Sequence, residues 1–345
     1  MRLLTPGLEE PSGIWILLHG LSCVSIDHPM LTRLARALAD AGFAVVLPEV
    51  LPWRDLDPMP EAADTTIRAI IDMIDDPVHE VHLTADLRST PVGLIGLSFS
   101  APQALIATRD PAISGRIQRV VTFGAYCDLR STLHFQFTGV HEHDGQRLYI
   151  APDPYGRWVL GGHLLRLIDG FQDAIQAANS LKEIARFSSL YSLDARHPRV
   201  TALVEGLRRT VPSEHRNAFD LLSGRLDDQK AHSHDERALL AEQLFEAAIH
   251  LSDRFDVRSR LHDVGVPVVI SHGRNDRLIP VSEAMKLRTA LRPQVQANLM
   301  LTGLVAHSTA DTPRAAASRL REVIGFAQGL AQVFHGLERA ATDGS

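Results

Sequence analysis

The chain has few of the features that mark secreted, nucleic-acid-binding or membrane-spanning proteins. Only two cysteines, Cys23 and Cys127, occur in 345 residues, which is too few for a disulfide framework and favours a reducing compartment. The 35 Lys and Arg residues are outnumbered by 41 Asp and Glu residues, and the net charge is −6. No basic field therefore exists to hold nucleic acid or anionic lipid.

Long apolar runs are also missing. No stretch approaches the roughly 18 residues of a membrane-spanning helix. The first ten residues carry acidic side chains and a proline where a signal peptide needs an apolar segment. Together with the scarcity of cysteine, these absences predict a cytoplasmic protein that has neither a membrane nor a nucleic acid as its partner.

What the chain does contain is enough apolar sequence for a large core. Hydrophobic residues make up 45% of it and charged residues 22%, as in a globular domain. The length exceeds one average domain, yet α/β folds often reach roughly 200–300 residues before they split. We therefore expect one core domain with an insertion rather than two equal domains.

Short apolar runs alternate with helical stripes in the first third of the chain. Parallel sheets with right-handed crossovers produce this alternation. The sheet pattern returns near 266–271 and 297–301, and a helix is expected from Pro313 onward. The predicted strands of the first third are 14–18, 43–48, 91–97 and 118–123, and the predicted helices are 29–40, 62–74 and 101–108.

The alternation breaks after about residue 126. A hairpin is expected from 132–140 and 146–151, because Asp144-Gly145 suits a turn that needs positive φ. Helices are expected at 162–187, 200–210, 213–223 and 233–255, the last with a capping-box signature at Ser233 and Glu236. These boundaries predict a core of residues 1–127 and 257–345, with a mainly helical cap inserted at 128–256.

A buried strand runs directly into a helix at Gly96-Leu97-Ser98-Phe99-Ser100. In this setting a sharp turn presents a serine hydroxyl at the carboxyl edge of a sheet, and small residues on both sides let helix and strand approach. The usual pattern ends in glycine, whereas this chain has Ser100. The alternative is an ordinary strand-to-helix turn with a solvated serine.

A serine nucleophile needs a base and a carboxylate that orients the base. Asp276 follows the predicted strand at 266–271, and His307 follows the next strand. Each residue taken alone is more often a turn or surface residue. Their order, and their shared position at the carboxyl edge of the sheet, predict a catalytic triad with Ser98.

Oxyanion stabilisation would come from backbone amides. Gly20 ends the first apolar strand and frees the backbone there, so we predict the amides of Leu21 and Phe99 as the donors. His19 is expected to brace this loop rather than to take part in catalysis.

These motifs resemble the α/β-hydrolase superfamily. The resemblance covers about 1–127 and 257–340 and implies a mostly parallel, eight-stranded sheet, with Ser98 as nucleophile, Asp276 as acid and His307 as base. It implies no cofactor. Dehalogenases of the superfamily use aspartate as the nucleophile and dienelactone hydrolases use cysteine, so Ser98 argues against both. The matching segments are Leu18 to Leu21, Gly96 to Ser100, His272 to Asp276 with Pro280, and Ala306-His307.

The resemblance implies a mechanism but no substrate, because the fold hosts many activities. The leading hypothesis is a serine carboxylesterase that cleaves small to medium acyl esters through an acyl-enzyme. A peptidase or amidase, a C–C bond hydrolase and a non-catalytic binding protein remain alternatives. An intact triad argues against a pure binder.

The cap is expected to shape the substrate pocket. Trp53, Phe137, Tyr155 and Trp158 are pocket candidates, although large apolar residues of an insertion more often form its own core. A homodimer formed through the predicted C-terminal helix remains an alternative, but we expect this helix to pack on the core of its own chain.

Two histidine pairs, His141 with His143 and His232 with His234, have spacings that could suit zinc. The first pair lies at the predicted hairpin tip and the second at a helix start, where exposed polar residues are usual. We therefore predict no metal site.

Overall fold

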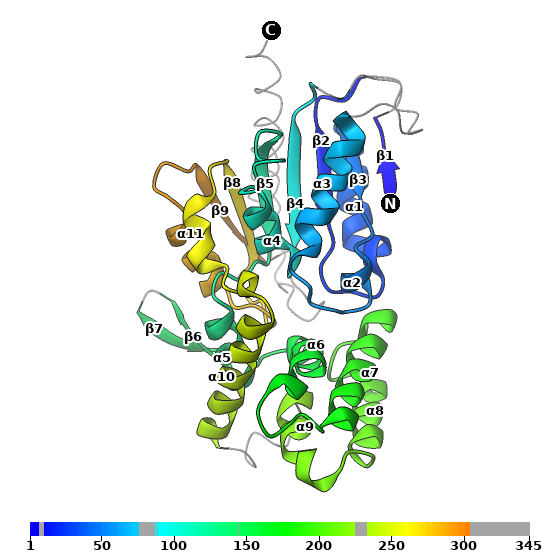
Figure 1. Cartoon of the computed structure of the whole chain (residues 1–345), viewed down its shortest axis with the longest axis vertical. Helices are drawn as coiled ribbons and strands as arrows, with labels where there is room; N and C mark the ends of the chain where they lie inside the picture. Colours follow the sequence, from blue (N-terminus) through cyan, green and yellow to red (C-terminus); the bar gives the residue numbers. More distant parts are fainter. Residues whose placement is uncertain (7–9, 76–86, 88, 144, 225–232, 304–345) are drawn as a thin grey trace.

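The computed structural model of the chain describes residues 1–6, 10–75, 87, 89–143, 145–224 and 233–303 (Figure 1). A seven-stranded sheet forms its centre, in the order β1-β3-β2-β4-β5-β8-β9, and all neighbours are parallel except β1 with β3. The strands are β1 (Arg2–Leu4), β2 (Ile14–Leu18), β3 (Ala44–Leu47), β4 (Val92–Leu97), β5 (Ile117–Phe123), β8 (Val268–Gly273) and β9 (Ala297–Thr302).

The predicted α/β class is confirmed. The strands and helices expected in the first 127 residues are present, each within one residue of its predicted ends, while β1 and the short α2 (Leu51–Arg54) were not expected. The resemblance implied eight strands, and the described residues supply seven to the main sheet. Helices flank the sheet: α1 (Pro29–Asp40), α3 (Ala62–Asp75), α4 (Ser100–Ala107) and α11 (Ser282–Ala290).

Both faces of the sheet are buried, which explains why the strand sequences are continuous apolar runs. All five residues of β2 are buried, and alternate side chains of a strand point to opposite faces. Ile14, Ile16 and Leu18 belong to the larger apolar cluster, which also holds residues of α3 and α4. Trp15 and Leu17 belong to a second cluster, which holds residues of α1. The sheet therefore carries apolar packing on both faces.

Between β5 and β8 the chain forms helices and a two-stranded sheet, and α6 to α9 make a lobe beyond one end of the main sheet (Figure 1). The division at 128 and 256 stays a prediction. The elements are α5 (Leu129–Thr138), β6 (Val140–His143), β7 (Gln146–Tyr149), α6 (Tyr155–Leu164), α7 (Ile175–Tyr191), α8 (Pro198–Arg208), α9 (Arg216–Ser223) and α10 (His234–Leu251).

The expected strand at 132–140 is wrong over most of its length. The β6–β7 hairpin exists, but residues 129–138 form the helix α5. The Asp128 side chain caps this helix by accepting a hydrogen bond from the Ser131 amide, and Gly139, with φ of 74°, ends it. The cap at Asp128 and the stop at Gly139 thus outweigh the β propensity of the ten residues between them.

The single helix expected at 162–187 is also wrong. Helix α6 ends at Leu164, and α7 begins at Ile175. Gly170 lies between them with φ of 85°, which breaks the helical path. By contrast, the predicted capping box at the start of α10 is confirmed, with hydrogen bonds in both directions between Ser233 and Glu236.

His141 was expected to be exposed at a hairpin tip, but it is buried in β6, where its ring meets that of Phe135 edge-on. Among the helices of the described residues, none combines the length and the apolar character required to cross a bilayer.

Candidate active site

The central sheet is mostly parallel and flanked by helices, and in such sheets functional side chains gather at the carboxyl ends of the parallel strands. Strand β4 lies in the middle of the sheet, between β2 and β5. It ends at Leu97, and α4 begins three residues later at Ser100. Ser98 is therefore held in the turn between a central strand and a buried helix.

Ser98 adopts a left-handed backbone conformation with φ of 56°, which L residues other than Asn and Asp rarely adopt. Its amide donates to the Phe123 carbonyl over 2.7 Å, and its carbonyl accepts from Ala101. Gly96 makes the sharp turn sterically feasible, because a Cβ atom there would lie 2.5 Å from the Ala101 Cα. A sharp turn from strand to helix with small flanking residues is the setting that the sequence predicted for Ser98.

Ser100 stands where the related motif usually has glycine. Its hydroxyl is fully buried, accepts a hydrogen bond from the Leu97 amide (2.8 Å) and lies 2.9 Å from the Leu18 carbonyl, to which it donates. The hydroxyl thus joins the ends of β4 and β2 across the turn. The departure from glycine adds two hydrogen bonds and fits the available space.

The loop after β2 packs directly on this turn. A Cβ atom at Gly20 would lie 3.0 Å from the Leu97 carbonyl oxygen and 3.2 Å from the Ser98 Cβ, so a side chain at this position would crowd the turn. Leu21 follows at once. Phe99, whose amide was the second expected oxyanion donor, is the residue before the first turn of α4, and amides at that position have no partner within the helix.

His19 braces the same loop. Its Nε2 accepts from the Val50 amide (3.0 Å), and its Nδ1 lies 2.7 Å from the Gly20 carbonyl oxygen. The Nδ1–H tautomer satisfies both contacts, because Nε2 must then be an acceptor. Burial lowers the pKa of His19, so the neutral ring is favoured. This arrangement fits the expected structural role.

Asp276 lies in the loop after β8 and is 1% exposed. Its Oδ1 accepts from the amides of Leu278 (2.9 Å) and Ile279 (3.0 Å), which fixes the carboxylate in a tight turn. The Nε2 atom of His272 lies 3.7 Å from Oδ2 and donates to the Ile279 carbonyl. His307 lies outside the described residues, so the triad stays a prediction.

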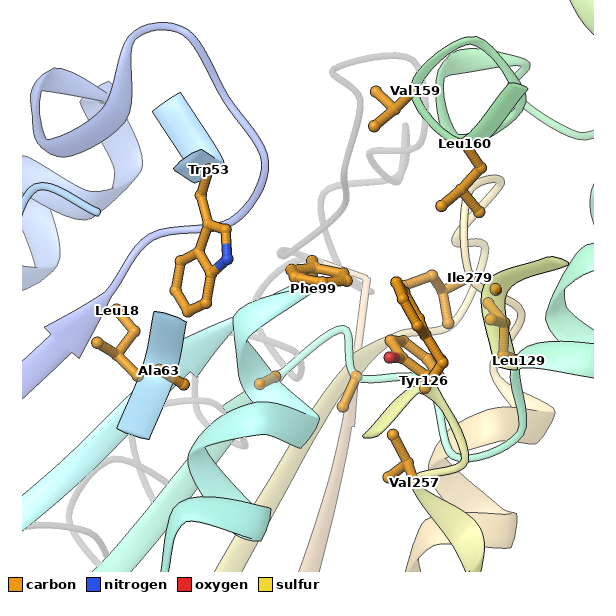
Figure 2. Packing of buried hydrophobic residues seen from close by; sticks show 14 of the residues in the cluster. Leu18, Trp53, Ala63, Phe99, Tyr126, Leu129, Val159, Leu160, Val257 and Ile279 are labelled. Atoms are coloured by element: carbon orange, nitrogen blue, oxygen red, sulfur yellow. The ribbon is translucent and has the colours of Figure 1, made fainter. Parts of the chain in front are cut away.

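Aromatic side chains surround the Ser98 turn. The Phe99 ring meets Trp53 edge-on at 5.8 Å between centroids and Phe255 at 6.1 Å. Figure 2 shows Phe99 between Trp53 on one side and Tyr126 and Ile279 on the other. The residue after the serine is thus fixed by rings from α2 and from the segment before β8.

The four pocket candidates lie in different settings. Trp53, Phe137 and Trp158 are buried at 0%, 3% and 1% exposure, and the indole of Trp158 donates to the Ser223 carbonyl. Tyr155 is partly exposed, and its hydroxyl donates to the Leu21 carbonyl over 3.0 Å. Their role in a pocket remains a prediction.

No group of three or more His, Cys, Asp or Glu side chains in the described part of the chain could hold a metal ion. His234 is exposed, and its ring lies 5.9 Å from that of His134, which the sequence did not single out. His232 lies outside the described residues.

Sequence reasoning missed three residues that hold the edges of this site. Arg277, Ser189 and Glu283 each bond to backbone groups of loops at the carboxyl edge or at the entry to the helical lobe. For Arg277, its position directly after the candidate catalytic Asp276 is a local signal that could have singled it out. Ser189 and Glu283 bond to residues more than 150 positions away in the sequence, and no local pattern marks either of them.

Comparisons with known proteins give only distant similarities. No protein family matches the sequence, and no curated protein matches it. Among solved structures, the esterase domain of a Rhodothermus marinus protein is 14% identical, with 95% of this chain and 90% of that chain covered and a TM-score of 0.41. The Paleococcus ferrophilus monoacylglycerol lipase is 14% identical, covers 98% of both chains and has a TM-score of 0.45.

Est1E from Butyrivibrio proteoclasticus, solved with ferulic acid bound, is 11% identical, with 96% of this chain and 94% of that chain covered and a TM-score of 0.46.

Proposed function

We propose that the protein is a serine hydrolase that cleaves carboxylic esters through an acyl-enzyme. The observation that carries the proposal is the geometry of Ser98, whose left-handed turn links a buried strand to a buried helix. Strained backbone of this kind persists where surrounding structure enforces it, and it concentrates at functional sites. A solvated turn serine would need neither the strain nor the close approach of Gly20.

The loops around Ser98 support the remaining roles. Strands β4 and β8 are separated in the sheet only by β5, so they lie about 10 Å apart at a spacing of about 4.8 Å per strand. Asp276 follows β8 and Ser98 follows β4, so an imidazole placed between the two strand ends would complete the relay. We assign that imidazole to His307, which follows β9 in the sequence.

In the proposed reaction, His307 takes the proton of the Ser98 hydroxyl as Oγ attacks the ester carbonyl carbon. The carbonyl oxygen becomes an oxyanion that the amides of Leu21 and Phe99 stabilise. His307 then protonates the leaving alcohol as the C–O bond breaks. Water, deprotonated by the same imidazole, attacks the acyl-enzyme and releases the acid. Asp276 holds the imidazole in the required tautomer.

Replacement of the serine tests the proposal. Ser98→Ala is expected to lower kcat for a p-nitrophenyl ester about 10³-fold or more, since the nucleophile is lost. Ser259→Ala, at an exposed serine, serves as the matched control and should retain wild-type turnover. Normal ester turnover by Ser98→Ala would contradict the proposal.

A fluorophosphonate probe separates an enzyme from a binding protein of the same fold. An activated serine forms an O–P bond with the probe and releases fluoride, so wild type should be labelled at Ser98. Absence of this adduct would favour the binding protein. A panel of esters, amides and ketonic substrates then ranks the esterase against the peptidase, amidase and C–C hydrolase alternatives.

A further inference from the structure

Four residues between β7 and α6, together with the first residue of α6, contact two separate loops at the carboxyl edge of the sheet. We call residues 151–155, Ala-Pro-Asp-Pro-Tyr, the strap. One end meets the loop after β8, which carries Asp276. The other end meets the loop after β2, which carries Leu21. Helix α6, which the strap leads into, lies on the side of the helical lobe that faces the sheet (Figure 1).

The first contact is a pair of hydrogen bonds with Arg277, the residue after Asp276. The Asp153 amide donates to the Arg277 carbonyl over 2.8 Å, and the Arg277 Nε donates to the Ala151 carbonyl over 2.9 Å. The bonds run in opposite directions, so neither segment can slide along the other without breaking one of them.

The second contact is made by Tyr155. Its hydroxyl donates to the Leu21 carbonyl over 3.0 Å, and its amide donates to the Asp153 carboxylate over 3.0 Å. Burial raises the pKa of the Tyr155 hydroxyl, so the group keeps its proton and remains a donor throughout the working pH range. The carbonyl and the amide of Leu21 flank the same Cα, so this bond restricts the orientation of the amide.

Helix α7 supports the same loop from a neighbouring position. The Ser189 hydroxyl accepts from the Cys23 amide over 2.8 Å and lies 3.4 Å from the Ser22 hydroxyl. The Ser189 hydroxyl also acts on the pKa of the Tyr155 hydroxyl, which it lowers against the larger effect of burial. Residues 21–23 are therefore held on the lobe side by two side chains, Tyr155 and Ser189.

The strap itself is stiff. Pro152 and Pro154 alternate with the other three residues, and each proline ring fixes φ near −65°. The Asp153 carboxylate accepts from the Tyr155 amide within the strap. The two prolines and this hydrogen bond restrict the backbone of the strap between its two contacts.

We propose that Tyr155 is a positioning residue for the reaction: through the Leu21 carbonyl it aligns the Leu21 amide for the oxyanion, and the strap couples this alignment to the loop that carries Asp276. This inference rests on the proposed hydrolase function of Ser98. It also gives Tyr155 a role different from lining a pocket, because its hydroxyl is engaged by the backbone of the oxyanion loop.

Tyr155→Phe tests the inference, because the change removes one oxygen and keeps the ring. The loss of a complete oxyanion donor costs about 10²–10³ in rate, and a misaligned donor should cost less. We therefore expect kcat for a p-nitrophenyl ester to fall about 10-fold while KM changes less than about 2-fold, since the oxyanion exists only in the transition state. Tyr191→Phe, at an exposed tyrosine of α7, is the matched control and should retain both constants.

A boronic acid inhibitor gives a readout that a purely structural role would not move. Its boron bonds to the serine Oγ, and a boron-bound oxygen takes the place of the oxyanion. The inhibition constant should rise with Tyr155→Phe by a factor similar to the fall in kcat/KM, and Ser189→Ala should produce a smaller change in the same direction. An unchanged kcat and an unchanged inhibition constant in Tyr155→Phe would overturn the inference.

The two proposals can fail separately. If wild type turns over esters and takes up the fluorophosphonate at Ser98, but Tyr155→Phe behaves as wild type, only the role of Tyr155 is refuted. If wild type shows neither turnover nor labelling, the hydrolase function itself is refuted, and the role of Tyr155 falls with it.

Discussion

Buried polar groups hold the residues around Ser98 in place. The Ser100 hydroxyl ties β2 to β4, and the His19 ring ties the loop after β2 to the amide of Val50. Each of these groups is almost completely buried. A polar group that loses its partner inside a protein costs free energy, because water cannot replace the lost hydrogen bond. Such groups therefore fix the turn more firmly than apolar packing alone would.

At the residue scale, we expect Ser100→Ala to lower the free energy of unfolding by about 1–3 kcal/mol, because the Leu18 carbonyl and the Leu97 amide would lose their partner. The measurement is urea denaturation. Ser282→Ala is the control, since Ser282 is equally buried but its hydroxyl has no hydrogen-bond partner within the described residues. Equal losses in the two variants would contradict this account.

At the scale of elements, Glu283 of α11 fixes the point where the chain leaves β5 for the helical lobe. Its fully buried carboxylate accepts from the amides of Cys127 (3.1 Å) and Asp128 (2.8 Å). The other oxygen accepts from the Ser131 hydroxyl (2.7 Å) and from the Lys286 ammonium (2.8 Å). One side chain thus joins α11, α5 and the end of β5.

Glu283→Gln should lower the free energy of unfolding by about 1.5–3 kcal/mol. The bonds from the two amides lose their charge assistance, and the new NH2 group would face the Ser131 hydroxyl and the Lys286 ammonium, which are both donors. Denaturation in urea measures the loss. Glu142→Gln provides the comparison, because the Glu142–Arg147 pair is exposed and such pairs contribute about 0–1 kcal/mol. A loss at Glu283 no greater than at Glu142 would refute the proposed anchoring.

At the scale of the whole molecule, one apolar cluster runs from the sheet into the lobe. It contains Leu18 and Trp53 as well as Trp158 and Phe219, so the lobe and the sheet share a core. The contact between them also includes His163 of α6, whose Nδ1 lies 3.6 Å from the Asp57 carboxylate. Burial, with a smaller effect of Lys182, lowers the pKa of His163 to about 4 although Asp57 acts in the opposite direction. The contact is therefore a neutral imidazole near a carboxylate at pH 7.

The stability of the whole molecule should consequently depend on pH. Unfolded His163 has an ordinary pKa near 6.5 and folded His163 one of about 4, so the unfolded state binds more protons between these values. The free energy of unfolding should fall as the pH is lowered from about 6.5 to 4, by at most about 1.4 kcal/mol per pH unit from this group.

Urea denaturation from pH 7.5 to 4 on wild type and His163→Gln isolates this contribution. The pH 7.5 values, where the imidazole is neutral in both states, give the baseline for each protein. The difference between the two proteins should shrink as the pH falls. Parallel curves would show that protonation of His163 does not oppose folding.

Local patterns predicted those parts of the fold whose conformation depends on neighbouring residues. The apolar runs of the first 127 residues predicted the strands, and the capping-box pair Ser233 and Glu236 predicted the start of α10. The turn at Ser98 followed from the small residues that flank it, because a strand can turn so sharply into a helix only where Cβ atoms leave room.

The amino-acid sequence by itself determined the parallel sheet, the place of Ser98 at its carboxyl edge and the order of the candidate catalytic residues, because each is set by periodicity or by steric demands within a few positions. Only the tertiary structure decided that 129–138 is helical, that His141 is buried, and that Tyr155 and Arg277 link two loops. The helix at 129–138 depends on a cap and a stop that compete with the β propensity between them, and His141 is buried against Phe135 of that helix. The links made by Tyr155 and Arg277 are hydrogen bonds between segments more than 100 residues apart, which no local pattern contains.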